Sequence, residues 1–141
     1  MNYKPIIIVP GEPNSIFFEL FFKVIKKKIK SPIILIASKK LLIKQAKILK
    51  KKINFSITNE FEIIKKKNRL KKINLIDVNF KQSSGFSKIT PKSNHYITSC
   101  FDIAINLLKN NVSNKFINGP ISKKTFLKKK FNGITEYLAH K

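Results

Sequence analysis

The sequence predicts an α/β domain in which a mostly parallel sheet is flanked by helices. Two runs of branched apolar residues, Ile6 to Val9 and Ile33 to Ala37, lack any polar alternation, as is usual for strands buried on both faces of a sheet. Each run precedes a segment whose apolar residues recur at helical spacing. This succession of strand and helix is the pattern of βαβ units, whose crossovers are right-handed.

Length and composition fit one domain with a substantial core. The chain has 141 residues, of which 43% are hydrophobic, and this argues against a disordered protein. A single cysteine, Cys100, excludes an internal disulfide, and two histidines exclude a Cys/His zinc cluster. The run Ile6 to Val9 is too short for a signal sequence or a membrane span. We therefore expect a cytoplasmic protein with no membrane partner.

A first helix is predicted over 16–30, where polar residues recur at helical spacing. Asn14 or Ser15 is a suitable N-cap. The expected buried face consists of Phe17, Leu20, Phe21, Val24 and Ile25. Such a basic amphipathic helix can also lie on a membrane surface, but a helix that follows a buried strand usually packs on the sheet.

A second surface helix is predicted over 39–52, with Ser38 as its cap. Its lysines at 40, 44, 47 and 51 trace one polar stripe, and Leu42, Ala46 and Leu49 lie opposite. The helix should therefore cover the sheet with its apolar side.

The middle of the chain has weaker patterns. Segments 54–58 and 73–78 resemble strands, and the basic segment 60–71 between them has no clear form. Residues 82–85, Gln-Ser-Ser-Gly, predict a flexible loop. Together these features suggest a peripheral or antiparallel excursion from the main sheet.

Thr90 and Pro91 predict the N-cap and first residue of a long helix that ends near Asn110. The face expected to be buried consists of Ile97, Cys100, Phe101, Ala104 and Leu108. Cys100 is therefore predicted to be a core residue rather than a nucleophile. His95, in the first turns, is predicted to be a solvated histidine.

The segment 115–141 contains the candidate binding site. A short strand breaks at Asn118-Gly119-Pro120, whose proline suits the first position of a helix predicted over 121–130. The helix start would offer free backbone N–H groups to an anion, with Ser122 and Lys123 adding a hydroxyl and a charge. A phosphate site and a plain strand-to-helix connection both fit, and this pattern alone favours the plain connection because Gly-Pro turns are common.

The net charge of +23 first suggests nucleic-acid binding, because a dense lysine surface gains from counterion release. Only Arg69 among the 30 basic residues is arginine, the residue that reads bases and clamps phosphates with two hydrogen bonds. Abundant Lys, Ile, Asn and Phe with few glycines are what an AT-rich genome produces. We therefore favour lysine drift at solvent-facing positions over a nucleic-acid surface, and either arrangement would attract small anions.

Three stretches in order carry a family resemblance. They are the strand that runs into Pro10-Gly11-Glu12-Pro13, then Ile117 to Lys123 (INGPISK), then Gly133 to Ala139 (GITEYLA). They resemble the N-terminal half of the 4-hydroxythreonine-4-phosphate dehydrogenases of vitamin B6 synthesis. In that family a first strand enters a GEP turn, a later strand ends in TGP or TAP with a lysine soon after, and a GHTE segment follows. Asn94-His95-Tyr96 is similar to the family's helix before the Gly-Pro turn.

This resemblance implies an isopropylmalate-dehydrogenase-like fold and an NAD- or NADP-dependent oxidation of 4-phosphohydroxy-L-threonine followed by decarboxylation. It also implies a homodimer when complete, and a divalent metal (Zn, Mg or Co) held by three histidines. Those ligands and most NAD contacts correspond to positions beyond Lys141. We therefore expect residues 1–141 to be the N-terminal part of such an enzyme, truncated and inactive alone.

The resemblance also implies four substrate-binding positions. Thr135 is the retained threonine of the GHTE segment, and Ile134 stands where the family has its histidine. Lys123 matches the lysine after the Gly-Pro turn, and Glu12 matches the acid of the GEP turn. No catalytic, cofactor-binding or metal-binding residue is identified in this chain.

Two alternatives remain open at the level of sequence. One is a lysine-rich module that binds nucleic acid or another polyanion, which predicts lysines gathered on one face with exposed aromatic residues between them. The other is a related decarboxylating dehydrogenase that acts on another phosphorylated hydroxy acid. The dehydrogenase hypothesis predicts scattered lysines and buried phenylalanines.

Overall fold

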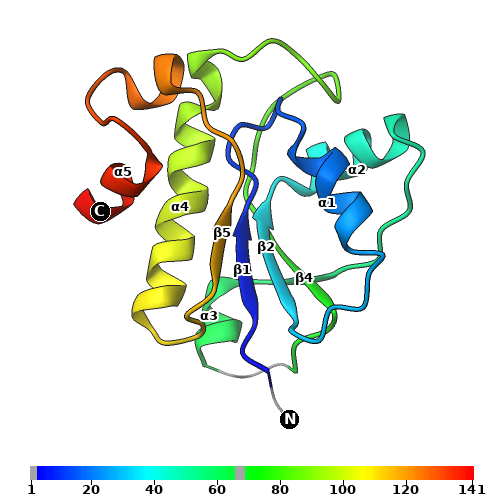
Figure 1. Ribbon diagram of the computed structural model, residues 1–141. Helices are drawn as coiled ribbons and strands as arrows, with labels where there is room; N and C mark the ends of the chain where they lie inside the picture. The colour runs from blue at the N-terminus through cyan, green and yellow to red at the C-terminus, as the bar shows by residue number, and fades with distance from the viewer. Residues whose placement is uncertain (1–2, 66–68) are drawn as a thin grey trace.

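The computed structural model describes residues 3–65 and 69–141, which form a parallel sheet with helices on both faces (Figure 1). The strands are β1 (Ile6–Val9), β2 (Ile33–Ala37), β3 (Ser56–Thr58), β4 (Ile73–Asp77) and β5 (Phe116–Asn118). Their order in the sheet is β3-β4-β2-β1-β5, and these neighbouring strands all pair in parallel. The predicted fold class is confirmed.

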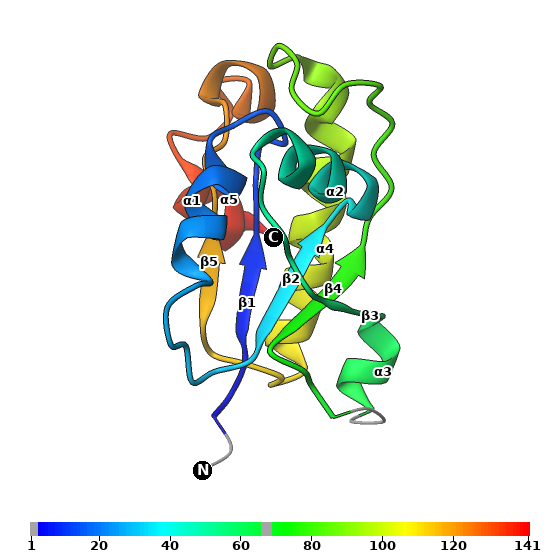
Figure 2. The same ribbon diagram turned by 90° about the vertical axis from the view of Figure 1, so that its right-hand side faces the viewer.

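The helices divide between the two faces of the sheet. They are α1 (Phe17–Val24), α2 (Lys39–Ile48), α3 (Glu60–Ile64), α4 (Asn94–Lys109) and α5 (Ile134–His140), with a 3-10 turn η1 (Pro91–Ser93) and a π turn η2 (Lys123–Leu127). Figure 2 shows α1 and α2 in front of the sheet and α4 behind it. Each face therefore has its own apolar core, one built with α1 and α2 and the other with α4, η2 and α5.

Both strands predicted in the middle of the chain exist and β3 lies at the edge of the sheet, but they are parallel to the others, so the antiparallel excursion is wrong. β4 lies inside the sheet between β2 and β3, with Leu75 in register with Leu35 of β2 and with Ile57 of β3. Asn74 of this strand is buried, and its side-chain amide is satisfied because it donates to the carbonyl oxygens of Ile33 and Lys71. Part of the basic connection, residues 66–68, lies outside the described residues.

The helix predicted over 16–30 is shorter than expected, and its buried face is rotated. α1 ends at Val24, and both Leu20 and Val24 are exposed. Phe21 is buried as predicted, but it is joined by Phe18 and Phe22, and the three rings pack against one another. This orientation buries three aromatic rings, whereas the expected face contained two, Phe17 and Phe21, and aromatic rings bring large apolar surfaces to the core.

The other helix predictions agree more closely with the structure. Ser38 caps α2, as its hydroxyl accepts the N–H of Leu41 at 3.4 Å, and Pro91 begins η1 directly before α4. Cys100 is buried in the core, and burial raises the pKa of its thiol to about 12. His95 is exposed, as predicted. No helix within residues 3–65 and 69–141 has the length and apolar character needed to cross a bilayer.

Candidate functional site

The loops that follow β1 and β5 lie side by side at the carboxyl edge of the sheet and then diverge. The loop after β1 leads to α1 on one face, and the loop after β5 leads to η2 on the other (Figure 1). In parallel α/β sheets, ligands bind outside the carboxyl ends of the strands at the point where neighbouring loops part. Topology therefore selects this pair of loops as the candidate site.

The two loops, each with a glycine next to a proline, are bonded through their backbones. Glu12 N donates to the carbonyl oxygen of Pro120 at 2.8 Å, and Gly119 N donates to that of Val9 at 2.8 Å. A Cβ atom added at Gly119 would lie 1.9 Å from Pro10 O, and one added at Gly11 would lie 2.3 Å from Pro120 O. Such close contact between backbones is possible only with glycine at both positions.

The helix predicted over 121–130 is largely wrong. The chain stays irregular after Pro120, and the π turn η2 begins only at Lys123, with Ser122 as its cap. Lys128 and Lys129 then take left-handed backbone conformations, with φ of 49° and 60°, and these end the turn. The predicted helix start that would bind an anion is therefore absent from this part of the described chain.

Some backbone N–H groups past Asn118 are nevertheless free. The N–H of Gly119 bonds to β1, but those of Ile121 and Ser122 have no hydrogen-bond partner among residues 3–65 and 69–141. The hydroxyl of Ser122 accepts the N–H of Thr125 at 3.1 Å and is already used as a cap. An anion at this loop would therefore meet two free amides.

Glu12, predicted to be a substrate-binding residue, has only 1% of its surface exposed. Ser93 Oγ lies 2.9 Å from its Oε2 and Asn14 N lies 3.3 Å from its Oε1. In this arrangement the carboxylate joins the loop after β1 to the start of α4. This buried position indicates that Glu12 holds the loop in place rather than contacting a substrate in an open cleft.

The start of α4 also holds the second loop. Asn94 Nδ2 donates to the carbonyl oxygen of Thr125 in η2 at 2.8 Å. The neighbouring residues Ser93 and Asn94 thus fix the β1 loop and η2 respectively. Sequence reasoning missed these roles, and the available signal was the polar pair Ser93-Asn94 directly after the predicted helix start at Thr90-Pro91.

A further set of amide side chains supports the β1 loop from the α2 side. Asn14 and Gln82 exchange two hydrogen bonds through their side-chain amides, of 3.1 and 2.9 Å. The buried Gln45 donates to the carbonyl oxygens of Pro13 and Gly85. The loop predicted over 82–85 is therefore present and bonded on several sides. The sequence signal for this support was Gln45 itself, a polar residue on the otherwise apolar side of α2.

The remaining predicted positions lie on η2 and α5. Lys123 and Thr135 are exposed, whereas Ile134 is half-buried and packs against the core on the α4 face. The rings of Phe126 in η2 and Tyr137 in α5 contact each other, with centroids 5.2 Å apart. This contact brings the segments that carry Lys123 and Thr135 together on one side of the sheet.

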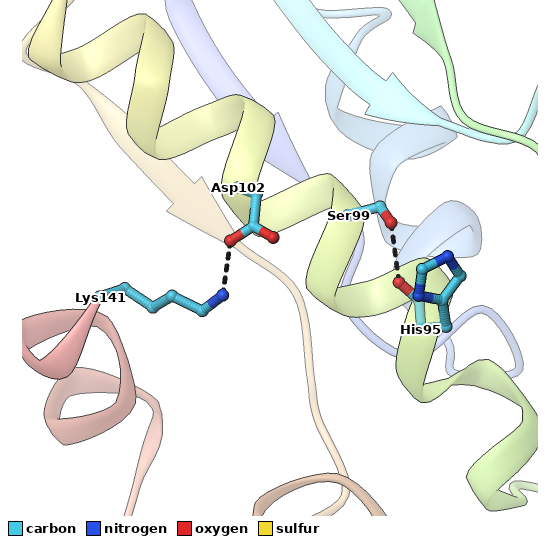
Figure 3. A network of polar contacts seen from close by, with 4 residues as sticks. All are labelled: His95, Ser99, Asp102 and Lys141. Carbon is cyan, nitrogen blue, oxygen red and sulfur yellow. Dashed lines mark hydrogen bonds and ion pairs between the residues drawn. The ribbon is translucent and has the colours of Figure 1, made fainter.

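The end of α5 is attached to the middle of α4. Lys141 Nζ donates to Asp102 Oδ1 at 2.6 Å, and this hydrogen bond raises the pKa of the lysine (Figure 3). On the same helix, Ser99 Oγ donates to the backbone carbonyl of His95. The ion pair is largely exposed, so we expect it to orient α5 more than to stabilise the fold.

The chain does not supply a complete metal site within the described residues. No group of three or more His, Cys, Asp or Glu side chains lies close enough together there to hold an ion. Two cavities, of about 310 and 170 Å³, lie beside β3 and between α4 and Lys141. Neither borders the loops after β1 and β5, so topology and hydrogen bonding, rather than cavity size, identify the candidate site.

Comparisons with known proteins agree with the topology. The family model of the pyridoxal phosphate biosynthetic protein PdxA matches residues 28–141. A 4-hydroxythreonine-4-phosphate dehydrogenase from Burkholderia phymatum superposes with a TM-score of 0.79 at 19% identity, over 99% of this chain and 44% of its own. A 4-hydroxythreonine-4-phosphate dehydrogenase from Klebsiella pneumoniae superposes with a TM-score of 0.79 at 19% identity, over 98% of this chain and 44% of its own. The chain thus spans less than half the length of these structures. No curated relative matches the sequence.

Proposed function

Because this chain belongs to the PdxA family of pyridoxal phosphate biosynthetic proteins, we propose that it forms the N-terminal part of an NAD- or NADP-dependent dehydrogenase acting on 4-phosphohydroxy-L-threonine. The proposal is supported by the fold shared with structures named for 4-hydroxythreonine-4-phosphate dehydrogenase. The observation that carries it is the pair of bonded Gly-Pro loops at the point where the sheet's connections diverge. The complete enzyme would be a cytoplasmic homodimer.

In this proposal the chain's own residues bind and orient the phosphorylated substrate. The free N–H groups of Ile121 and Ser122 would donate to phosphate oxygens, and the exposed ammonium of Lys123 would add an opposite charge. The hydroxyl of Thr135 would donate a hydrogen bond to a second polar group of the substrate. Ile134 offers no hydrogen bond where the family has histidine, so anchoring here would depend on Thr135 alone.

Glu12 has an indirect role in this scheme. Its buried carboxylate holds the β1 loop against α4 and so keeps the Gly119-Pro120 loop in place through Glu12 N. Rigid support of this kind keeps binding groups in their productive geometry. We therefore propose Glu12 as a positioning residue for the substrate site.

The proposed reaction removes a hydride from the alcohol carbon and a proton from its oxygen, and the resulting 3-oxo acid then loses carbon dioxide. The nicotinamide cofactor, when bound, would accept the hydride. The described residues of this chain do not fit the divalent metal of the family, because they contain no group of three ligands. We therefore assign no step of the reaction to a metal held by this chain.

The polyanion-binding alternative retains one supporting observation, the net charge of +23. Against it, ten of the twelve phenylalanines lie in or against the two cores, and only Phe61 and Phe86 are exposed. Single-stranded nucleic acids are usually bound on rows of exposed aromatic rings. The packing of the aromatic residues therefore favours the dehydrogenase.

The proposed function is tested by assaying reduction of NAD and of NADP with 4-phosphohydroxy-L-threonine. The chain is assayed alone and together with the part of the Klebsiella pneumoniae enzyme outside the aligned 44%. We expect no turnover from the chain alone and turnover from the combination. Tight binding of arbitrary oligonucleotides at physiological salt, without turnover by the assembled pair, would contradict the proposal.

A further inference from the structure

The larger of the two cavities lies at the edge of the sheet farthest from β5, between β3, α3 and the segment before β4 (Figure 2). Its volume of about 310 Å³ is at the lower end of the range found for small-molecule sites. Its lining combines polar, cationic and apolar side chains, and no Asp or Glu is among the described residues that line it. The cavity therefore has the composition of a site for a small anion.

The polar wall of the cavity comes from β3 and β4. Ser56 and Thr58 are two residues apart on β3, so their side chains point to the same face of the sheet. Thr58 is in register with Ile76, which packs in the core on the α4 face, so both hydroxyls lie on that face. Thr58 Oγ1 donates to Glu62 Oε2 at 3.1 Å, whereas Ser56 Oγ has no hydrogen-bond partner within residues 3–65 and 69–141. Ser56 is thus free to donate to a ligand.

The cationic wall is the segment directly before β4. Arg69 and Lys71 both line the cavity, and neither side chain has an ion-pair or hydrogen-bond partner in the described part of the chain. Asn74 holds this segment, because its side-chain amide accepts the N–H of Lys71 at 2.9 Å and donates to the Lys71 carbonyl oxygen at 2.7 Å. A bond of 3.0 Å from Asn74 Nδ2 to Ile33 O attaches the segment to β2. The backbone that carries the two charges is therefore held in place.

Arg69 is the only arginine among the 30 basic residues of the chain. A guanidinium presents N–H donors in a fixed plane that match the two oxygens of a carboxylate, and the ammonium of lysine has no such geometry. The one side chain of this kind therefore lines a cavity and has no internal partner. This combination indicates a ligand whose anionic head accepts two parallel hydrogen bonds.

The apolar part of the lining indicates the rest of the ligand. It consists of Ile57, Ile63 and Leu70, of which Ile63 is buried and Ile57 is 52% exposed. An inorganic anion would leave this apolar surface in contact with water, whereas an aliphatic chain would cover it. The cavity volume corresponds to about ten water molecules of the liquid, which is room for a short chain and its head group.

We propose that this cavity is a binding site for a small aliphatic carboxylate, with Arg69 holding the carboxylate through two hydrogen bonds. Ser56 donates a further hydrogen bond, and Lys71 adds a second positive charge. The aliphatic chain of the ligand lies on the apolar part of the lining. This site goes beyond the proposed function, because the cavity borders neither loop of the candidate substrate site.

The test is a titration of the 141-residue chain with hexanoate, followed through the backbone amide shifts in NMR spectra. We expect saturable binding, with the largest shift changes at 56–58 and 69–74. Acetate lacks the aliphatic chain and should bind at least about tenfold more weakly. Hexylamine has the same chain with a cationic head and should not bind, because the lining carries two positive charges and no acid.

Two variants separate the guanidinium from charge alone. Arg69→Lys keeps the charge but removes the paired donors, and should weaken hexanoate binding about tenfold. Lys65→Ala is the matched control, because Lys65 is exposed at the end of α3 but does not line the cavity. Both side chains are exposed, so both variants should keep the melting temperature of the parent chain.

Several results would overturn the proposal. They are a lack of saturable binding of hexanoate, equally tight binding of acetate or hexylamine, and equal losses from Arg69→Lys and Lys65→Ala. Tighter binding of hexyl phosphate than of hexanoate would reject the carboxylate as the ligand class. Shift changes confined to the loops after β1 and β5 would place the ligand in the candidate substrate site instead. None of these results depends on turnover, so this site and the proposed activity fail separately.

Discussion

Ser93 Oγ lies 2.9 Å from Glu12 Oε2 and so joins the start of α4 to the loop after β1 across 81 residues of sequence. The contact is buried, and Asn94 beside it holds η2 in the same way. One helix start thus fixes both loops of the candidate site. The site's shape therefore depends on hydrogen bonds that do not themselves contact a ligand.

Substituting Ser93→Ala should lower the free energy of unfolding by about 1–3 kcal/mol, because it leaves a buried carboxylate oxygen without its donor. Urea unfolding measures the change. Ser99→Ala is the matched control, since the Ser99 hydroxyl bonds only to a carbonyl of its own helix. Equal effects of the two substitutions would show that the Glu12 contact has no special role.

Gly119→Ala should destabilise the protein by at least about 1–3 kcal/mol, because its methyl group would overlap the carbonyl oxygen of Pro10. Gly133→Ala is the control, because no atom lies within 4 Å of a Cβ at that position. Thermal unfolding of the two variants checks the prediction. Similar melting temperatures would mean that the two loops are not in close contact.

The thiol of Cys100 should react slowly with an alkylating reagent in the folded protein and quickly in denaturant, because burial raises its pKa to about 12. The folded protein also keeps a proton that the unfolded chain loses above the ordinary value of 9.0. The free energy of unfolding should therefore fall between pH 9.0 and about 12. Rapid alkylation of the folded protein at neutral pH would contradict this burial.

The sequence predicted the central strands and α4 well, because their signals are local. The unbroken runs of branched apolar residues in β1 and β2 are typical of buried strands, and Thr90-Pro91 marks a helix start by its own geometry. The position of β4 was missed because pairing with a distant strand leaves no local signal. The rotation of α1 was missed because helical spacing alone does not rank competing apolar faces.

The candidate site was predicted only in outline. The resemblance drew attention to the Gly-Pro loop and the Thr135 segment, and the contact between Phe126 and Tyr137 joins their elements. The prediction of a helix directly after Pro120 was wrong because Gly119 is hydrogen-bonded to β1. The chain therefore continues in irregular structure past this contact, and the π turn η2 begins only at Lys123. The supporting amides of Gln45 and Asn94 bond across long sequence separations, which a local pattern does not reveal.

We propose that this chain provides one wall of a site for a phosphorylated hydroxy acid. Calorimetric titration of 4-phosphohydroxy-L-threonine into the 141-residue chain measures this binding, with Lys47→Ala on the outer side of α2 as the control for lost charge. We predict saturable binding that Lys123→Ala and Thr135→Ala each weaken about tenfold and Lys47→Ala leaves unchanged. Binding that falls equally in all three variants, or no binding at all, would contradict the claim.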